Sequence, residues 1–250
     1  MKLTALQGVV RRRVLLNFRV DPEVIQRQLP EPFRAKLVGG WAIAGICLIR
    51  LEQLRPSGLP QALGLSSENA AHRVAVTWAD PNGQEREGVY VLRRDTSSPL
   101  NALVGGRFFP GEHDRARFSV QEDAHTLELV MRTLDGLADV RLKAHPSQDL
   151  PSSSAFGSLA GASRFFEAGA IGYSPSCGGT RLDGLELYTR AWHIEPLAVE
   201  LVEASYYRAE SRFPAGSLAF DSALVMRDIP HEWRPVSGPT APVCPTRRPR

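Results

Sequence analysis

One carboxylate stands at an apolar position of a predicted strand, where a buried acid–base group is expected. Glu87 shares a strand face with Val89 and Val91. A carboxylate on an apolar face is costly unless it is paired, and burial raises its pKa. Glu87 is therefore a candidate general acid or base near neutral pH. The alternative is a residue at the end of a hairpin that faces solvent or pairs with Arg73 or Arg86.

A second acid–base candidate follows Pro110-Gly111, where a predicted helix ends. His113 and Asp114 lie there, in a segment crowded with charge. Histidine titrates closest to neutral pH, so a histidine beside carboxylates can shuttle a proton. We predict His113 and Asp114 as catalytic residues together with Glu87. The alternative is a solvated histidine in a loop.

Two arginines and a histidine are candidates for ligand binding. Arg107 occupies an apolar-stripe position of a predicted helix, next to Phe108. A guanidinium there needs an acidic partner or binds an anionic ligand through two hydrogen bonds. His72 and Arg73 stand at the start of a predicted hairpin. Their side chains could face the same pocket as Arg107. We predict Arg73, Arg107 and His72 as ligand-binding residues.

No motif in the sequence indicates a metal ion or a cofactor. His72, Glu87, His113 and Asp114 could converge, but they have no HxH or HExxH spacing. The three cysteines are far apart and form no CxxC pair, which argues against both a zinc site and a disulfide framework. No Gly-x-Ser-x-Gly motif is present, so a nucleophile elbow is not supported. The expectation is no metal and no cofactor.

Composition and charge restrict the class of protein and its partners. The 250 residues are 43% hydrophobic and 23% charged, as in a globular protein with a sizeable core. The net charge is only +3, and three arginines of the C-terminal tail supply much of the excess, so a nucleic-acid partner is not indicated. No apolar run is long enough for a membrane span or a signal segment. These features predict a cytoplasmic protein with a small-molecule ligand and no membrane partner.

Hairpin signals dominate the chain. The segments His72–Ala79 and Arg86–Leu92 are joined by the turn sequence Asp-Pro-Asn-Gly. Helices are predicted after Asp21-Pro22, from Ser98 to Phe108, and from a cap at Ser154 to about Glu167. Further strands are predicted at 14–20, 41–51, 115–121, 126–133, 137–144, 185–194, 198–206 and 222–227.

Strands and helices do not alternate regularly, which argues against a parallel sheet. We therefore predict a mainly β (α+β) fold, an antiparallel barrel or cone with a few peripheral helices. Residues 1–234 form one domain. Residues 235–250 are rich in proline and arginine and are predicted to be a disordered tail.

Four segments, with LELYT between them, resemble a YqjF-like bacterial family of unknown function in the acetoacetate decarboxylase-like superfamily. They read RRRVLLNFRVDPEVIQRQLP, SENAAHRVAV, GVYVLRRDTSSPLNALVGGRFFPGEHDRARFSV and FDSALVMRDIPHEW. The resemblance covers about Leu3 to Trp233. It implies a barrel or cone of antiparallel strands that encloses an apolar cavity, with small helices around it.

The resemblance also bears on the chemistry. In acetoacetate decarboxylase a lysine forms a Schiff base, and its amine must be neutral to attack. That lysine lies in a Pro-Lys-Lys segment shortly after a Gly-Arg helix end. Here the helix end is Gly106-Arg107, and by this register Asp114 and Arg115 replace the lysine pair. An aspartate cannot form an imine, whereas Glu87 falls near the active-site glutamate of the decarboxylase.

Three hypotheses follow. The leading one is a cavity that binds a small organic molecule such as an acid, with Arg73 or Arg107 as anion partner and Glu87 as polar anchor. The alternative is an acid–base enzyme that acts on a carbonyl or lactone compound through Glu87 and His113. A third is an interaction protein whose cavity is filled by its own side chains. Self-association into a homo-oligomer is compatible with each.

Overall fold

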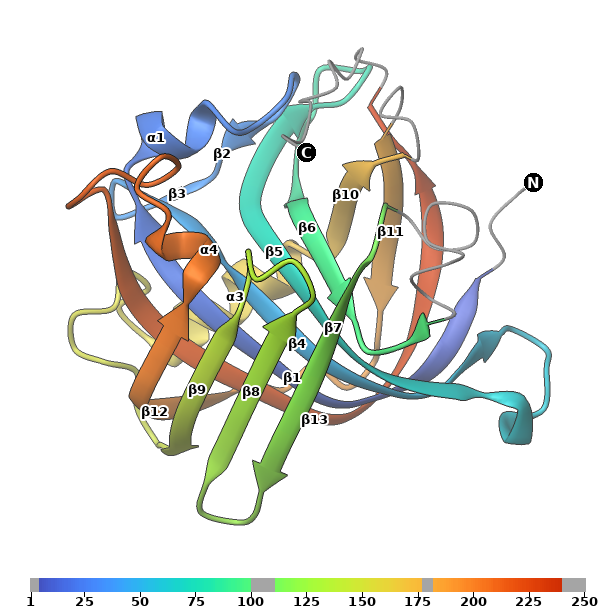
Figure 1. Cartoon of the computed structure of the whole chain (residues 1–250). Coiled ribbons are helices and arrows are strands. Elements are labelled where there is room, and N and C mark those ends of the chain that lie inside the picture. Colours follow the sequence, from blue (N-terminus) through green and yellow to red (C-terminus); the bar gives the residue numbers. More distant parts are fainter. Residues whose placement is uncertain (1–4, 100–110, 177–181, 240–250) are drawn as a thin grey trace.

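The computed structural model describes residues 5–99, 111–176 and 182–239, and most of them lie in strands (Figure 1). The strands are β1 Leu6–Val20, β2 Arg34–Ala35, β3 Leu37–Val38, β4 Trp41–Pro56, β5 Leu65–Ala79, β6 Glu85–Thr96, β7 Asp114–Glu122, β8 Leu127–Thr133, β9 Val140–Pro146, β10 Ile171–Pro175, β11 Leu182–Tyr188, β12 Glu195–Ala204 and β13 Leu218–Ser237. The helices are α1 Pro22–Gln26, the 3-10 turn η1 Gln61–Leu63, α3 Leu159–Ala168 and α4 Ser205–Arg208.

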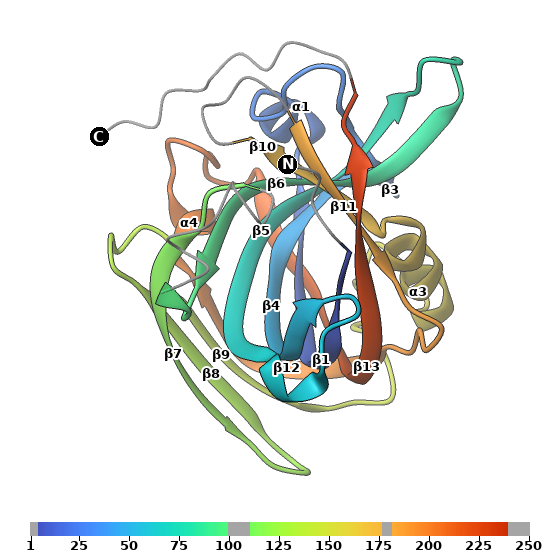
Figure 2. The same ribbon diagram turned by 90° about the vertical axis from the view of Figure 1, so that its right-hand side faces the viewer.

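The strands pair into two closed rings that share one wall. The wall consists of β13, β1, β4, β5 and β6, each hydrogen-bonded to the next. In the larger ring, β7, β8, β9 and β12 connect β6 back to β13. In the smaller ring, β10 and β11 make the same connection. Figure 2 shows the two additions on opposite sides of the wall, with β7, β8 and β9 on one side and β11 on the other.

The two faces of the wall carry separate cores, because successive side chains of a strand point to opposite faces. Leu16, Ile46 and Val74 face the larger ring and belong to the main apolar cluster, which fills that ring. Leu15 and Cys47 face the other way and pack in a second cluster that includes Ala162 and Phe166 of α3. The smaller ring and α3 therefore cover the same face of the wall.

Local sequence explains where the helices begin. The Asp21 carboxylate accepts hydrogen bonds from the backbone N–H groups of Glu23 and Val24, and Pro22 takes the first helical position. The N-cap of α3 is Ser158, four residues later than the predicted Ser154. Ser154 instead donates its hydroxyl to buried Asp221, at 2.8 Å. The helix thus begins after a polar contact between distant segments, which local sequence does not reveal.

The sequence-based prediction of a mainly β fold with few helices is confirmed, in the form of a cone-like ring. The hairpin of β5 and β6 is antiparallel, as predicted. The sheet also contains two short parallel pairings that were not predicted, of β6 with β7 and with β10. Short strand β10 was not predicted. The predicted helix 98–108 falls almost entirely outside the described residues.

The last strand extends past the predicted domain boundary. Residues Pro235 to Ser237 of β13 pair with Leu185 to Asp183 of β11, so these three tail residues belong to the smaller ring. Residues 240–250 lie outside the described part of the chain. Within the described residues, no helix is long and apolar enough to cross a membrane.

Candidate functional site

A cavity of about 130 Å³ lies on the face of the wall that the smaller ring covers. Strands β1, β4, β5, β6, β10, β11 and β13 all contribute to its lining, together with the residues after α3. The lining is apolar except for a small polar group: Arg13, Arg73, Arg94, His113, Cys47 and Asn69. Among the described residues, the lining has three guanidinium groups and no carboxylate, so this part of the cavity carries an excess of positive charge.

The three cavity arginines have no acidic partner. Ion pairs neutralise many other arginines of the chain, such as Arg12 with Glu68 and Arg93 with Asp95. Arg13, Arg73 and Arg94 form no such pair with any described Asp or Glu. The segments 1–4, 100–110, 177–181 and 240–250, which are not described, contain no Asp or Glu. A cluster of uncompensated guanidinium groups is unusual, because taking a charge out of water is costly without a partner.

Arg73 is the most buried of the three, with 3% of its surface exposed. Its Nη2 donates to Asn17 Oδ1 at 2.9 Å, whereas Nε and Nη1 are buried without a hydrogen-bond partner. The guanidinium lies over the Phe166 ring of α3. Burial lowers the pKa of Arg73 to about 10. Two N–H groups of this cavity-lining residue therefore have no hydrogen-bond acceptor among the described residues.

Arg94 and His113 are held together at another part of the cavity. Arg94 donates from Nη2 and Nε to Ser174 Oγ, at 2.8 and 3.1 Å, and burial lowers its pKa to about 10. His113 Nδ1 lies 3.2 Å from the carbonyl oxygen of Gly111, which can only accept, so the ring proton belongs on Nδ1. Burial, helped by the charge of Arg94, lowers the pKa of His113 to about 3. The histidine is therefore neutral at physiological pH.

Gly111 allows this segment to approach Arg94 closely. Its φ of +75° lies in the left-handed region. A Cβ at this position would meet the Ser174 Cβ at 2.9 Å and Arg94 Nε at 3.3 Å. Only glycine fits both the backbone conformation and the space, so the break that the sequence indicated has a positioning role.

Cys47 and Arg13 form the third polar part of the lining. Cys47 is 3% exposed, and its Sγ accepts a hydrogen bond of 3.1 Å from Arg13 Nε. Arg13 also places Nη1 3.9 Å from the sulfur of Met226. The guanidinium is thus held against two sulfur atoms instead of a carboxylate.

Glu87 does not line this cavity. Its carboxylate forms an ion pair with Lys36, whose ammonium lies 4.3 Å from the centre of the Phe165 ring. Lys36 lines a much smaller adjoining cavity of about 10 Å³, which shares Arg13 and Arg73 with the main one. Glu87 is therefore near the charged end of the site but already has a cation partner.

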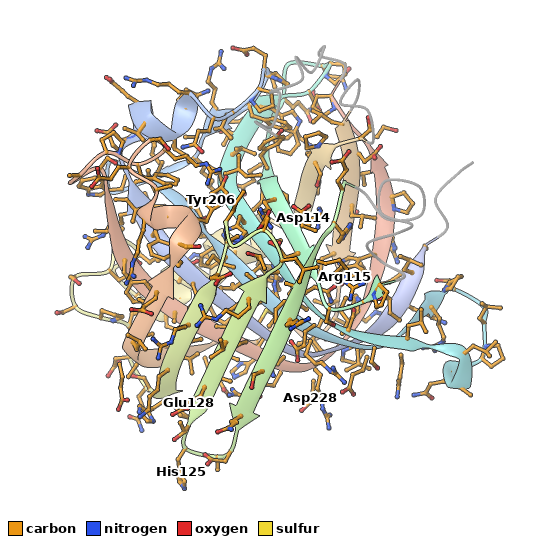
Figure 3. All side chains as sticks on the ribbon, in the orientation of Figure 1. Asp114, Arg115, His125, Glu128, Tyr206 and Asp228 are labelled. Atoms are coloured by element: carbon orange, nitrogen blue, oxygen red, sulfur yellow. The ribbon has the colours of Figure 1, made fainter. Side chains whose placement is uncertain are left out.

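His72 and Asp114 face the larger ring. His72 is fully buried against Tyr206, with 4.5 Å between ring centres, and its Nε2 is 3.8 Å from Asp95. Asp114 begins β7 (Figure 3), and its carboxylate lies 3.5 Å from Arg93, which also holds Asp95. These residues belong to a polar cluster in the main core, on the opposite face of the wall from the cavity.

The structure thus divides the predicted site residues. Arg73 and His113 line the cavity, Glu87 lies beside the adjoining one, and His72 and Asp114 lie in the larger ring. Arg107 lies outside the described residues. Lys143 pairs with Glu128 and Glu200 at the surface and cannot serve the cavity.

Sequence reasoning missed Arg13, Arg94 and Cys47. A signal existed for Arg13, because it alternates with Leu15 on the same strand face, as Arg73 does with Ala75. Alternation along β6 could not indicate Arg94, because Leu92 is an extra residue without a partner on β5. This bulge moves the residues that follow it to the opposite face of the sheet. Among the described residues, no cluster of His, Cys, Asp and Glu could hold a metal ion.

Comparison with known proteins identifies the family of this chain. Residues 9–210 match DUF2071, a family described as an uncharacterized conserved protein. The chain belongs to this family. A comparison with curated proteins finds no match.

Solved structures with the fold of this DUF2071 protein include acetoacetate decarboxylase and related enzymes. The acetoacetate decarboxylase of Legionella pneumophila has a TM-score of 0.61 at 13% identity, over 97% of this chain and 90% of that one. An acetoacetate decarboxylase-like enzyme of Sphingomonas wittichii RW1 has a TM-score of 0.61 at 12% identity, over 98% and 95%. The enduracididine biosynthesis enzyme MppR, complexed with pyruvate, has a TM-score of 0.57 at 9% identity, over 93% and 89%. At these identities the likeness shows the fold of the DUF2071 chain, as the resemblance implied.

Proposed function

We propose that the cavity of the smaller ring binds a small organic acid through its carboxylate. The observation that carries this proposal is the pair of buried Arg73 N–H groups without an acceptor, in a cavity whose lining holds three arginines and no acid. A carboxylate accepts two parallel hydrogen bonds from one guanidinium, which is the strongest form of this contact. The bound anion would supply the missing counter-charge and raise the pKa of Arg73 toward its ordinary value.

The rest of the lining favours a ligand whose part beyond the carboxylate is apolar. Its walls are apolar, with Val10, Leu51, Leu54, Leu185, Leu187 and Trp233 among the lining residues. Apolar surface favours a hydrocarbon body by about 25 cal/mol per Å² buried. The cavity therefore suits an acid with a short aliphatic or aromatic body. MppR, whose fold is similar, is known in complex with pyruvate, a small keto acid.

Binding of this kind does not depend on a Schiff-base lysine. Among the described residues, no lysine lines the main cavity, and Lys36 beside it is paired with Glu87. A protonated ammonium held by a carboxylate is a poor nucleophile, since imine formation needs the neutral amine. The acid–base alternative through Glu87 and His113 stays a prediction, because only His113 lines the cavity.

A thermal-shift screen tests the proposal. The panel contains pyruvate, acetoacetate, butyrate, hexanoate and benzoate, each beside the alcohol or amide of the same carbon skeleton. Ligand at about a hundredfold above Kd stabilises the folded state by about 2.7 kcal/mol, a rise of several degrees in Tm. We expect acids to raise Tm and their neutral counterparts to have no effect. Equal shifts for both members of each pair, or no shift at all, would refute an anion site.

Two variants locate the binding. Arg73→Met removes the guanidinium and keeps an apolar side chain over Phe166, and it should abolish the acid-specific shift. Arg11→Met is the matched control, because Arg11 is exposed and pairs with Asp228 at the surface. The control should keep the full shift.

A further inference from the structure

The cavity contains a thiol between two of its arginines. Cys47 lies in the middle of β4, opposite Ala71 of β5. On the same strand, Ile49 is paired with Arg13 of β1 and Gly45 with Arg73 of β5. Arg13 and Arg73 are therefore two of the four diagonal neighbours of Cys47 on this face of the wall, and the other two are Asn17 and Asn69. Cys47, Arg13 and Arg73 all line the cavity.

Arg13 contacts the sulfur directly, and Arg73 lies beside it in the sheet. Arg13 Nε donates to Cys47 Sγ at 3.1 Å. Burial lowers the pKa of Arg73, and the largest opposing influence is Cys47. A cysteine that merely fills a core lies among apolar groups, whereas Cys47 lies at the cavity wall against one guanidinium and next to another.

An independent observation places a ligand next to this thiol. Arg73 is 97% buried and presents Nε and Nη1 without a partner at the same cavity. An anion held there would lie beside the sulfur. The part of the acid closest to Cys47 is then the carbon that bears the carboxylate.

We propose that Cys47 is a nucleophile that adds covalently to an organic acid whose electrophilic carbon bears the carboxylate, as in a 4-oxo-2-alkenoate. The proposal rests on the function proposed above, since Arg73 must hold the carboxylate for the carbon to meet the sulfur. A thiolate is a soft nucleophile, and a conjugated double bond is a soft electrophile. The apolar walls described above accept the remainder of the chain.

The addition balances without a further reactant. The sulfur forms a bond to the carbon that bears the carboxylate, and the carbon–carbon π bond breaks. Its electron pair moves toward the ketone and gives an enolate, and the carbon next to the ketone then takes up the proton that the thiol has lost. The product is a thioether whose mass is the sum of protein and acid. Cationic Arg13 and Arg94 would stabilise the negative charge while it develops.

The test uses 4-oxo-2-pentenoate as the probe and the full chain with Cys177→Ser and Cys244→Ser, so that Cys47 is its single thiol. The neutral counterpart is 3-penten-2-one. Each rate with the protein is divided by the rate of the same reagent with 2-mercaptoethanol, and peptide mapping locates the adduct. We expect this ratio to be at least about tenfold higher for the acid than for the ketone, the effect of one charge-assisted hydrogen bond. A ratio that is equal for both, or an adduct elsewhere than Cys47, would overturn the proposal.

Variants test the role of the anion site. Arg73→Met should remove the preference for the acid, so that acid and ketone then give the same ratio, whereas Arg11→Met should keep the preference in full. If Arg73→Met does not fold, protection replaces it: a carboxylate that raises Tm should slow the modification of Cys47 in proportion to its occupancy. Unprotected modification would count against the proposal.

The two proposals fail in different ways. If carboxylates raise Tm but Cys47 reacts no faster than a thiol in solution, the anion site stands and the nucleophile is refuted. If no carboxylate raises Tm and Cys47 shows no preference for the acid, both are refuted.

Discussion

The guanidinium of Arg73 lies over the ring of Phe166, 4.9 Å from its centre, and this contact joins α3 to the cavity. Arg73 comes from the shared wall and Phe166 from the one long helix of the described residues. The ring leaves the edge of the guanidinium, with its N–H groups, available to the cavity. The helix therefore contributes to the site by holding a cation and does not merely cover the sheet.

Replacing this ring should affect stability and binding together. Phe166→Ala should lower the free energy of unfolding by about 3–5 kcal/mol, because a buried aromatic side chain is deleted. Phe166→Leu keeps most of the apolar volume and loses mainly the cation–π contact, so its cost should be nearer 1–2 kcal/mol. Urea unfolding measures both. A negligible cost for Phe166→Leu would show that the ring face does not matter to Arg73.

Gly111 should be intolerant of a side chain for two separable reasons. Gly111→Ala adds a Cβ at a φ of +75° and places it 2.9 Å from the Cβ of Ser174. Gly83→Ala is the matched control, since its φ is +77° and nothing lies within 4 Å of the added atom. The control should cost about 1 kcal/mol, from backbone conformation alone. Gly111→Ala should cost clearly more and should also weaken carboxylate binding, because Arg94 and His113 must move.

The polar cluster of the larger ring should be structural. Arg93 donates to both carboxylate oxygens of fully buried Asp95 at 2.6–3.0 Å. Asp95→Asn removes the most buried of three carboxylates around Arg93, which keeps Asp135 and Asp114, and should cost about 1–3 kcal/mol. The exposed pair of Arg141 and Glu203 provides the comparison, where Glu203→Gln should cost under about 1 kcal/mol. Carboxylate binding should survive in both variants, since this cluster and the cavity lie on opposite faces of the wall.

The strands were largely predictable because alternation and turn chemistry are local signals. The β5–β6 hairpin follows from Val74, Val76 and the Asp-Pro-Asn-Gly turn, and α1 follows from Asp21 and Pro22. The division into two rings was not predictable, because it depends on parallel pairings of β6 with β7 and β10 that span only two residue pairs each. Those pairings decide which face of the wall becomes a cavity. Sequence could indicate that His72 and Arg73 were unusual, but not that they face opposite rings.

Buried neutral histidines should make the protein less stable in acid. Burial, with the charges of Arg93 and Arg212, lowers the pKa of His72 to about 3, against 6.5 for an exposed histidine. Between these values the unfolded chain binds a proton that the folded one does not. Stability is therefore full above pH 6.5 and falls as pH drops, by about 1.4 kcal/mol per pH unit for each such group. His113 and His231, with pKa values of about 3 and 4, act in the same direction.

Asp95 opposes this trend. Burial raises its pKa to about 6, so between about pH 4 and 6 the folded state holds a proton that the unfolded chain releases. A variant isolates the histidine contribution: His72→Phe should reduce the pH dependence of the unfolding free energy between pH 6 and 4 by about 1.4 kcal/mol per unit. Urea unfolding at several pH values measures this slope. An unchanged slope would mean that His72 is protonated in the folded protein.

The central claim is that Arg73 holds the carboxylate of a small acid, and calorimetric titration tests it most directly. The ligand is the acid that gives the largest thermal shift, titrated into the unmodified protein, Arg73→Met and Arg11→Met. Loss of a charge-assisted hydrogen bond costs about 1.5–3 kcal/mol, so Kd should rise by roughly ten- to a hundredfold in Arg73→Met and stay the same in Arg11→Met. An unchanged Kd in folded Arg73→Met would contradict the account.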